Sequence, residues 1–157
     1  MPSNPRFYII LNRVAGTGQA ASIWPKIETQ LKQKQFHYDL QLSHYAGHTT
    51  QLAFQFAKFK YTDQILLIIG GDGTLNQAIN GLQNAQRGDI PIAYIPCGSG
   101  NDFARGVGIS RDPLTALEQI LSATMPTAID LGYYHDTTKN DHGYFVNTVG
   151  IGFDANV

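Results

Sequence analysis

The chain has 157 residues, 43% of them hydrophobic and 15% charged, with a formal net charge of −1. This length is typical of one domain, and the aromatic content (8 Tyr, 8 Phe, 1 Trp) together with the low net charge excludes a disordered chain. The charge also argues against a general nucleic-acid-binding protein, which needs a basic surface to neutralise phosphates, and the single cysteine, Cys97, excludes an intramolecular disulfide.

Hydrophobic periodicity predicts strands that alternate with helices along the chain. Strands are predicted over 6–11, 38–43, 63–69 and 90–95, and helices over 20–35, 49–58, 74–82, 102–106 and 113–123. The run Asp63–Ile69 is almost continuously apolar, which is typical of a strand covered on both faces in a parallel sheet. The order therefore predicts an α/β fold, with an open, mostly parallel sheet and helices on both faces.

The last 30 residues follow a different pattern. Two strands are predicted over Thr127–Tyr134 and Tyr144–Val149, and the polar stretch His135–His142 between them indicates a hairpin rather than a helical crossover. We therefore expect an α/β domain over residues 1–126, and over 127–157 a hairpin that begins a second, truncated domain.

No segment predicts an anchor in the membrane. The longest uninterrupted aliphatic run is Ile65–Ile69, far short of the roughly 20 residues that cross a bilayer, and no apolar stretch of signal-peptide length precedes the first strand. Together with the lone cysteine, these features predict a cytoplasmic location.

Three glycine-bearing loops follow predicted strands: Asn12–Gly18, Gly70–Thr74 and Gly98–Asp102. In an open parallel sheet, ligands bind beyond the carboxyl ends of the strands, where loops run into helix N-termini. Glycine lets the backbone approach an anion closely, and a helix N-terminus presents N–H groups with a favourable dipole. The three loops therefore predict a nucleotide site.

The first loop also fits a dinucleotide fingerprint, Gly16-x-Gly18-x-x-Ala21, with Asp39 about 20 residues on. This match is weak, because Asp39 falls at the start of its predicted strand rather than at the end, and a strand-to-helix turn without a ligand explains the glycines equally well. The Gly-x-x-x-x-Gly-Lys-Ser/Thr pattern of Walker-type nucleotide sites does not occur in the chain.

The second loop, Gly70-Gly71-Asp72-Gly73-Thr74, is the stronger signal. A carboxylate between glycines at a strand end is costly unless it binds a cation, holds the loop by hydrogen bonds or handles a proton. Thr74 has a second interpretation as a helix cap.

Two longer motifs carry a family resemblance. Residues 70–81 (GGDGTLNQAING) and 96–105 (PCGSGNDFAR) resemble the catalytic domain of the diacylglycerol kinase and sphingosine kinase family, and are most similar to the bacterial soluble diacylglycerol kinase-like lipid kinases. NAD kinases share the first motif but not the second. Further family marks are Asn12 with Gly16 and Gly18, Gly47-His48, Asp130-x-Gly132 and the segment 145–155.

The resemblance implies a kinase that transfers the γ-phosphate of ATP, with Mg²⁺, to a lipid hydroxyl such as that of diacylglycerol at the membrane surface. The residues that it places at the nucleotide are Asn12, Gly16, Ser43, Gly70, Gly71, Asp72, Gly73, Thr74, Asn76, Ser99 and Asn101. It assigns magnesium, partly through water, to Asp72, Asp102 and Asp130, and a catalytic role to Asp72. Carboxylates suit Mg²⁺, and phosphoryl transfer depends on cation charge near the phosphates.

The chain departs from the family pattern in three respects. Arg13 stands where the family usually has proline, and Gln77 where it usually has glutamate, which removes one carboxylate beside the phosphates. Family members are about twice as long, and their second, β-rich domain carries the lipid site and the catalytic base. We therefore expect this chain to be inactive alone, and its unpaired terminal strands to allow a homodimer.

Three other functions remain open on the sequence. An NAD kinase-like enzyme shares the GGDGT element, a non-catalytic regulator could bind nucleotide through the same loops, and a Rossmann oxidoreductase rests on the first loop alone. No nucleic-acid partner is expected, and Cys97 is not expected to act as a nucleophile.

Overall fold

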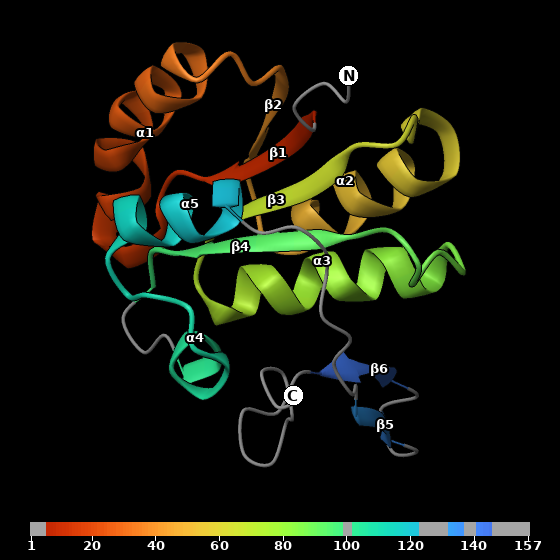
Figure 1. The fold of residues 1–157 in the computed structure, drawn as a ribbon. Helices are drawn as coiled ribbons and strands as arrows, with labels where there is room; N and C mark the ends of the chain where they lie inside the picture. Colours follow the sequence, from red (N-terminus) through yellow and green to blue (C-terminus); the bar gives the residue numbers. More distant parts are fainter. Residues whose placement is uncertain (1–5, 99–101, 123–131, 137–140, 146–157) are drawn as a thin grey trace.

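A computed structural model describes residues 6–98, 102–122, 132–136 and 141–145 of the chain (Figure 1). The strands are β1 (Phe7–Asn12), β2 (Tyr38–Ser43), β3 (Ile65–Gly70), β4 (Ile92–Pro96), β5 (Gly132–Asp136) and β6 (Asp141–Phe145). The helices are α1 (Ala15–Gln33), α2 (His48–Gln55), the π-helical turn η1 (Phe56–Lys60), α3 (Asp72–Asn84), α4 (Asp102–Val107) and α5 (Pro113–Ser122). The predicted alternation of strands and helices is confirmed.

The first four strands form one parallel sheet in the order β2-β1-β3-β4. The register pairs Asn12 with Ser43 at the end of β2, and Gly70 at the end of β3 with Pro96 at the end of β4. Leu11 pairs with Ile69, so β1 and β3 also end at the same level. All four strands therefore deliver their following loops to one edge of the sheet.

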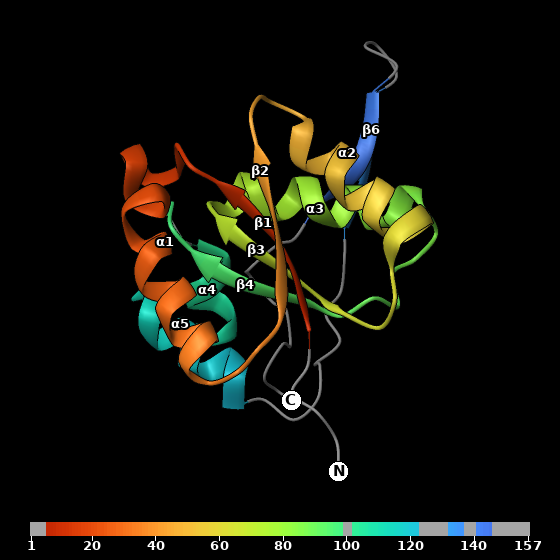
Figure 2. The same ribbon diagram turned by 90° about the horizontal axis from the view of Figure 1, so that it is seen from above.

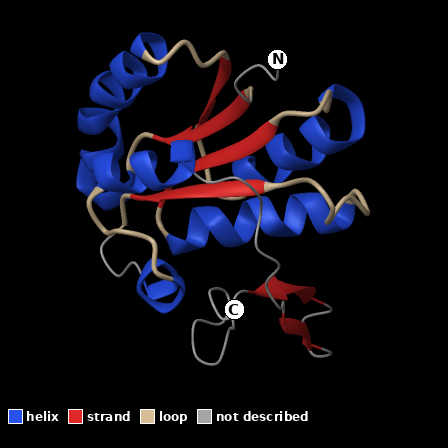
Figure 3. Cartoon of the chain, in the orientation of Figure 1, coloured by secondary structure: helices blue, strands red, loops and turns tan. Residues whose placement is uncertain are grey.

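Helices cover both faces of this sheet, as Figures 2 and 3 show. Successive residues of a strand point to opposite faces, so β1 contributes Phe7, Ile9 and Leu11 to one core and Tyr8 and Ile10 to the other. The first core is closed by α1 and α5, and the second by α2, η1 and α3, with Ala104 of α4 at its margin. The continuous apolar character of β3 follows from burial on both sides, which confirms the predicted fold class.

Helix α3 begins at Asp72, two residues earlier than the sequence predicts, and Gly71 is its N-cap. The glycines around Asp72 indicated a loop, but an acidic residue in the first turn is stabilised by the helix dipole. The turn between β3 and α3 is therefore short, and Asp72 lies on the helix rather than in a loop.

The terminal hairpin forms a separate two-stranded antiparallel sheet, and β6 lies against α3. Its strands differ from the prediction, because His135 and His142, expected in the connection, pair with each other across the two strands. In a hairpin the turn type and the loop length fix the register, and the polar stretch 135–142 carries no two-residue turn signal such as Asn-Gly to locate the turn. The outer parts of the predicted strands, 127–131 and 146–149, lie outside the described residues.

No helix within the described ranges is both long enough and apolar enough to cross a membrane.

Helices α2 and α3 are in close contact because α3 carries a glycine where the two helices meet. A Cβ atom added to Gly81 would lie 2.5 Å from the carbonyl oxygen of Thr50 and 2.7 Å from the Cβ of Ala53. Gly73, eight residues earlier on the same helix, has no atom within 4 Å of such a Cβ.

We predict that Gly81→Ala destabilises the protein by about 1–3 kcal/mol, because the added methyl group forces α2 away from α3. The matched variant Gly73→Ala should be neutral or more stable by up to about 1 kcal/mol, since alanine favours a helix over glycine. Thermal unfolding of both variants beside the wild type measures the difference, and equal midpoints would contradict the close packing.

Candidate functional site

The edge at which the four strands end brings the predicted loops together. The first loop leaves β1 at Asn12, and the first turn of α1 is interrupted by a left-handed kink, with φ of 61° at Gly16, 54° at Thr17 and 95° at Gly18. A Cβ atom added to Gly16 would lie 2.0 Å from the carbonyl oxygen of Cys97, the residue between β4 and the third loop. Glycine is therefore required at position 16 by its conformation and by the contact with Cys97.

The second loop is held from the side of β1. The amide Nδ2 of Asn12 donates a hydrogen bond of 3.1 Å to Oγ1 of Thr74, which is buried in the first turn of α3. The Oδ1 atom of Asn12 accepts from the backbone N–H of Val14 at 3.3 Å. Asn12 thus uses both ends of its amide to connect the first loop with the second.

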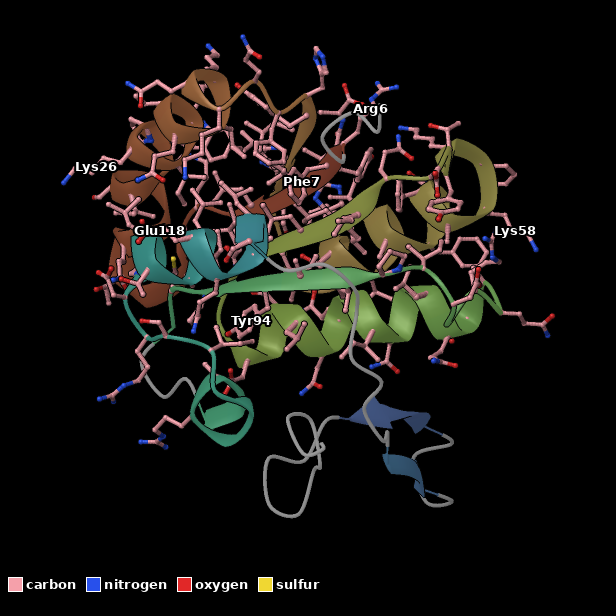
Figure 4. The ribbon with its side chains drawn as sticks, in the orientation of Figure 1. Arg6, Phe7, Lys26, Lys58, Tyr94 and Glu118 are labelled. Atoms are coloured by element: carbon pink, nitrogen blue, oxygen red, sulfur yellow. The ribbon has the colours of Figure 1, made fainter. Side chains whose placement is uncertain are left out.

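The same loop is held from the side of β4 by Tyr94, which lies between β4 and the beginning of α3 (Figure 4). The hydroxyl of Tyr94 donates a hydrogen bond of 3.0 Å to Oδ1 of Asp72. Burial, and then the charge and hydrogen bond of Asp72, raise the pKa of Tyr94 far above its ordinary value, so the phenol stays protonated and acts as the donor.

The third loop follows β4, whose last residue, Pro96, pairs with Gly70 at the end of β3. The backbone N–H of Cys97 donates to the carbonyl of Gly70 at 2.8 Å, and a Cβ atom added to Gly71 would lie 3.3 Å from the Cα of Gly98. Two backbones therefore pass each other here with little room for side chains. Burial raises the pKa of the Cys97 thiol to about 11, which agrees with the prediction that it is not a nucleophile.

Ser43 lies at the end of β2, beside Asn12 in the sheet. Its Oγ accepts a hydrogen bond of 2.9 Å from Oγ1 of the buried Thr49 in α2. His48, at the start of the same helix, accepts the backbone N–H of His44 on its Nδ1 atom at 2.9 Å. The β2 end of the edge is thus lined by hydroxyl and imidazole groups from the strand and from α2.

The structure brings together eight of the predicted nucleotide residues at this edge: Asn12, Gly16, Ser43, Gly70, Gly71, Asp72, Gly73 and Thr74. Asn76 follows in the first turns of α3. Ser99, Asn101 and Asp130 lie outside the described residues, and of Asp102 only its position as the first residue of α4 is described. Within the described part of the chain, no three His, Cys, Asp or Glu side chains are grouped to hold a metal.

Asp39, the acidic residue of the alternative dinucleotide fingerprint, is the second residue of β2. It therefore lies toward the opposite edge of the sheet from the glycine loops, as its place at the start of the predicted strand indicated.

Sequence reasoning missed Tyr94. The available signal is a tyrosine in the otherwise apolar strand 92–96, because a buried phenol usually needs a hydrogen-bond partner. The sequence does not show which partner that is.

Comparison with known proteins decides the family. A sequence model described as the diacylglycerol kinase catalytic domain matches residues 6–134 of the chain. The chain belongs to this family. The resemblance carried by the GGDGT and GSGNDFAR elements is therefore confirmed.

Relatives of this diacylglycerol kinase domain carry lipid kinase names. The protein named "Putative lipid kinase YtlR" of Bacillus subtilis is 32% identical over 155 residues, which cover 96% of this chain and 49% of that protein. "Putative lipid kinase SA0681" of Staphylococcus aureus is 33% identical over 118 residues, covering 74% of this chain and 36% of that protein. The chain thus spans about half the length, or less, of these relatives.

Solved structures show the same fold. A Bacillus anthracis structure described as "a putative diacylglycerol kinase" superimposes with a TM-score of 0.69 at 24% identity, over 90% of this chain and 49% of that one. A second structure from that organism gives 0.68 at 25% identity, over 88% and 47%.

We predict that Gly16→Ala lowers the thermal midpoint more than Gly18→Ala does. Both substitutions place alanine in a left-handed conformation, at a cost of about 1–2 kcal/mol. Only the methyl group at position 16 meets the Cys97 carbonyl, which adds about 1–3 kcal/mol of overpacking. Parallel thermal melts of the two variants measure the difference, and a greater loss for Gly18→Ala would contradict the loop contact.

Proposed function

We propose that this domain binds ATP with Mg²⁺ and forms the nucleotide-binding part of a lipid kinase. The observation that carries the proposal is the turn from β3 into α3, which exposes Gly73 on the first turn of the helix and is held in place by Asn12 and Tyr94. A helix N-terminus preceded by glycine is suited to a phosphate, because backbone N–H groups and the helix dipole both attract an anion.

The nucleotide would lie along the edge with its phosphates at Gly70–Asn76 and at the start of the third loop. The close approach between Gly71 and Gly98 supports this orientation, since neither position carries a side chain that blocks the backbone. Neighbouring strands of a sheet are about 4.8 Å apart, so Ser43, two strands from Gly70, is roughly 10 Å away. The remainder of the nucleotide therefore extends toward Asn12 and Ser43.

The residues present fit a magnesium ion bound with the nucleotide. Mg²⁺ is usually held by one or two carboxylates together with substrate phosphates, and Asp72 is a half-buried carboxylate in the first turn of α3. Asp102 and Asp130 stay predictions as further ligands. Bound there, the ion would neutralise phosphate charge during transfer.

The acceptor is proposed to be a lipid alcohol such as diacylglycerol, in keeping with the names of the relatives. In the transfer, the acceptor oxygen forms a bond to the γ-phosphorus, the bond from that phosphorus to the β–γ bridging oxygen breaks, and ADP leaves. The hydroxyl proton passes to a base, which we place outside these 157 residues, together with the lipid site. The domain therefore contributes the positioned phosphate donor.

A phosphate-transfer assay tests the acceptor class. The full-length protein is incubated with radiolabelled ATP and Mg²⁺, and diacylglycerol, a sphingoid base or NAD is offered in separate reactions. We expect label in a lipid product. Label in NAD alone would identify an NAD kinase-like enzyme, and saturable ATP binding without transfer to any acceptor would identify a regulator.

Asp72 is predicted to be essential for this transfer. Asp72→Asn in the full-length protein should lower turnover by at least about a hundredfold, the scale of an electrostatic or proton-handling group. The thermal midpoint should change little, because the asparagine oxygen can still accept the hydrogen bond of Tyr94.

The matched control is Asp39→Asn, an exposed carboxylate at the start of β2. It should leave turnover unchanged, because Asp39 is remote from the loops. A large loss of stability in Asp72→Asn with turnover intact would assign Asp72 a structural role instead.

A further inference from the structure

Tyr94 is a side chain of β4 that reaches the first residue of α3, Asp72. Its side chain is 3% exposed and packs in the core between the sheet and α3, among residues such as Ile68, Leu75 and Ala104. Its hydroxyl extends beyond this apolar core to Oδ1 of Asp72, 22 positions earlier in the chain. The contact joins the middle of β4 to the first residue of α3.

We infer that Tyr94 is a positioning residue, which holds the carboxylate of Asp72 in the orientation needed for magnesium and for phosphoryl transfer. The inference rests on the proposed function and adds to it a residue that touches neither nucleotide nor metal.

The geometry gives Tyr94 this role because its ring is buried in the core, while Asp72 is half-buried at the start of α3. A phenol anchored in a close-packed core is a fixed donor, so its hydrogen bond selects one orientation of the acceptor. A phenol keeps its proton at neutral pH, so Tyr94 is the donor and the carboxylate of Asp72 is the acceptor.

Asn12 acts on the same turn from the other side, but it contacts Thr74 rather than the carboxylate. The two strands beside β3 therefore contact different residues at the start of α3. Asn12 fixes the position of the helix turn, and Tyr94 fixes the direction of the acidic side chain.

The chain provides a matched control in Tyr8. Tyr8 is also 3% exposed, lies on β1 in the same core and stacks on Phe56 with ring centroids 4.3 Å apart. Among the described residues, its buried hydroxyl has no hydrogen-bond partner. Tyr8→Phe and Tyr94→Phe thus remove the same atom from equally buried rings, and only the second removes the bond to Asp72.

The test measures both variants in the full-length protein, by lipid phosphorylation and by titration calorimetry with ATP at several Mg²⁺ concentrations. We expect Tyr94→Phe to lower kcat by at least about tenfold and to raise the Mg²⁺ concentration needed for half-maximal ATP binding, because a misplaced ligand loses positioning. KM for the lipid should stay the same. Tyr8→Phe should match the wild type in every measurement.

A double-mutant cycle with Asp72→Asn tests whether Tyr94→Phe changes ATP binding through Asp72. If Tyr94 acts through Asp72, adding Tyr94→Phe to Asp72→Asn should change Mg²⁺-dependent ATP binding less than twofold, although it has a large effect alone. Additive effects, or equal behaviour of Tyr94→Phe and Tyr8→Phe, would overturn the inference.

The outcomes separate this inference from the proposed function. A wild type that binds ATP with Mg²⁺ but phosphorylates no lipid refutes the lipid kinase assignment, while the binding measurements still decide the role of Tyr94. A wild type that phosphorylates lipid, with no effect of Tyr94→Phe on kcat or on Mg²⁺ dependence, refutes the inference alone. A wild type that does not bind ATP overturns both.

Discussion

The site depends on hydrogen bonds that reach the β3–α3 turn from both neighbouring strands. Asn12 at the end of β1 binds Thr74, Tyr94 on β4 binds Asp72, and the N–H of Cys97 binds the carbonyl of Gly70. Strand β3 lies between β1 and β4, so its following turn is within reach of both. A short glycine-rich turn has little structure of its own, and these contacts replace the side-chain packing that it lacks.

The glycines of this edge have a second effect, which is to let main chains approach each other. The left-handed turn at Gly16 lies against the Cys97 carbonyl, and Gly71 lies against Gly98. At these two contacts the loops therefore meet through backbone atoms, and backbone N–H groups at such turns are suited to phosphate oxygens. In the proposed function, backbone N–H groups and the helix dipole bind the phosphates, and only a few side chains orient metal and phosphate.

The sequence by itself determined the fold class and the family, and it predicted the edge of the sheet at which the glycine loops meet. Strands buried on both faces must be apolar along their whole length, as Ile65–Ile69 is, and this pattern distinguishes a parallel sheet from a half-exposed one. Glycines after three of the strands predicted where the loops gather, and the GGDGT and GSGNDFAR elements indicated the family that the comparison confirmed. Each of these signals lies within a short stretch of the chain, so one sequence is enough to detect it.

Only the tertiary structure decided where α3 begins, how the terminal hairpin pairs and which group contacts Asp72. Glycines occur both in loops and beside helix ends, so those beside Asp72 do not show where the helix begins. The pairing of His135 with His142 depends on the turn and loop length, and the polar stretch between the predicted strands carries no clear turn signal. The bond from Tyr94 to Asp72 exists because β4 aligns with β3 in one register and α3 packs back across both. Contacts of this kind join residues that are distant in the chain, and their spacing in the sequence follows no rule.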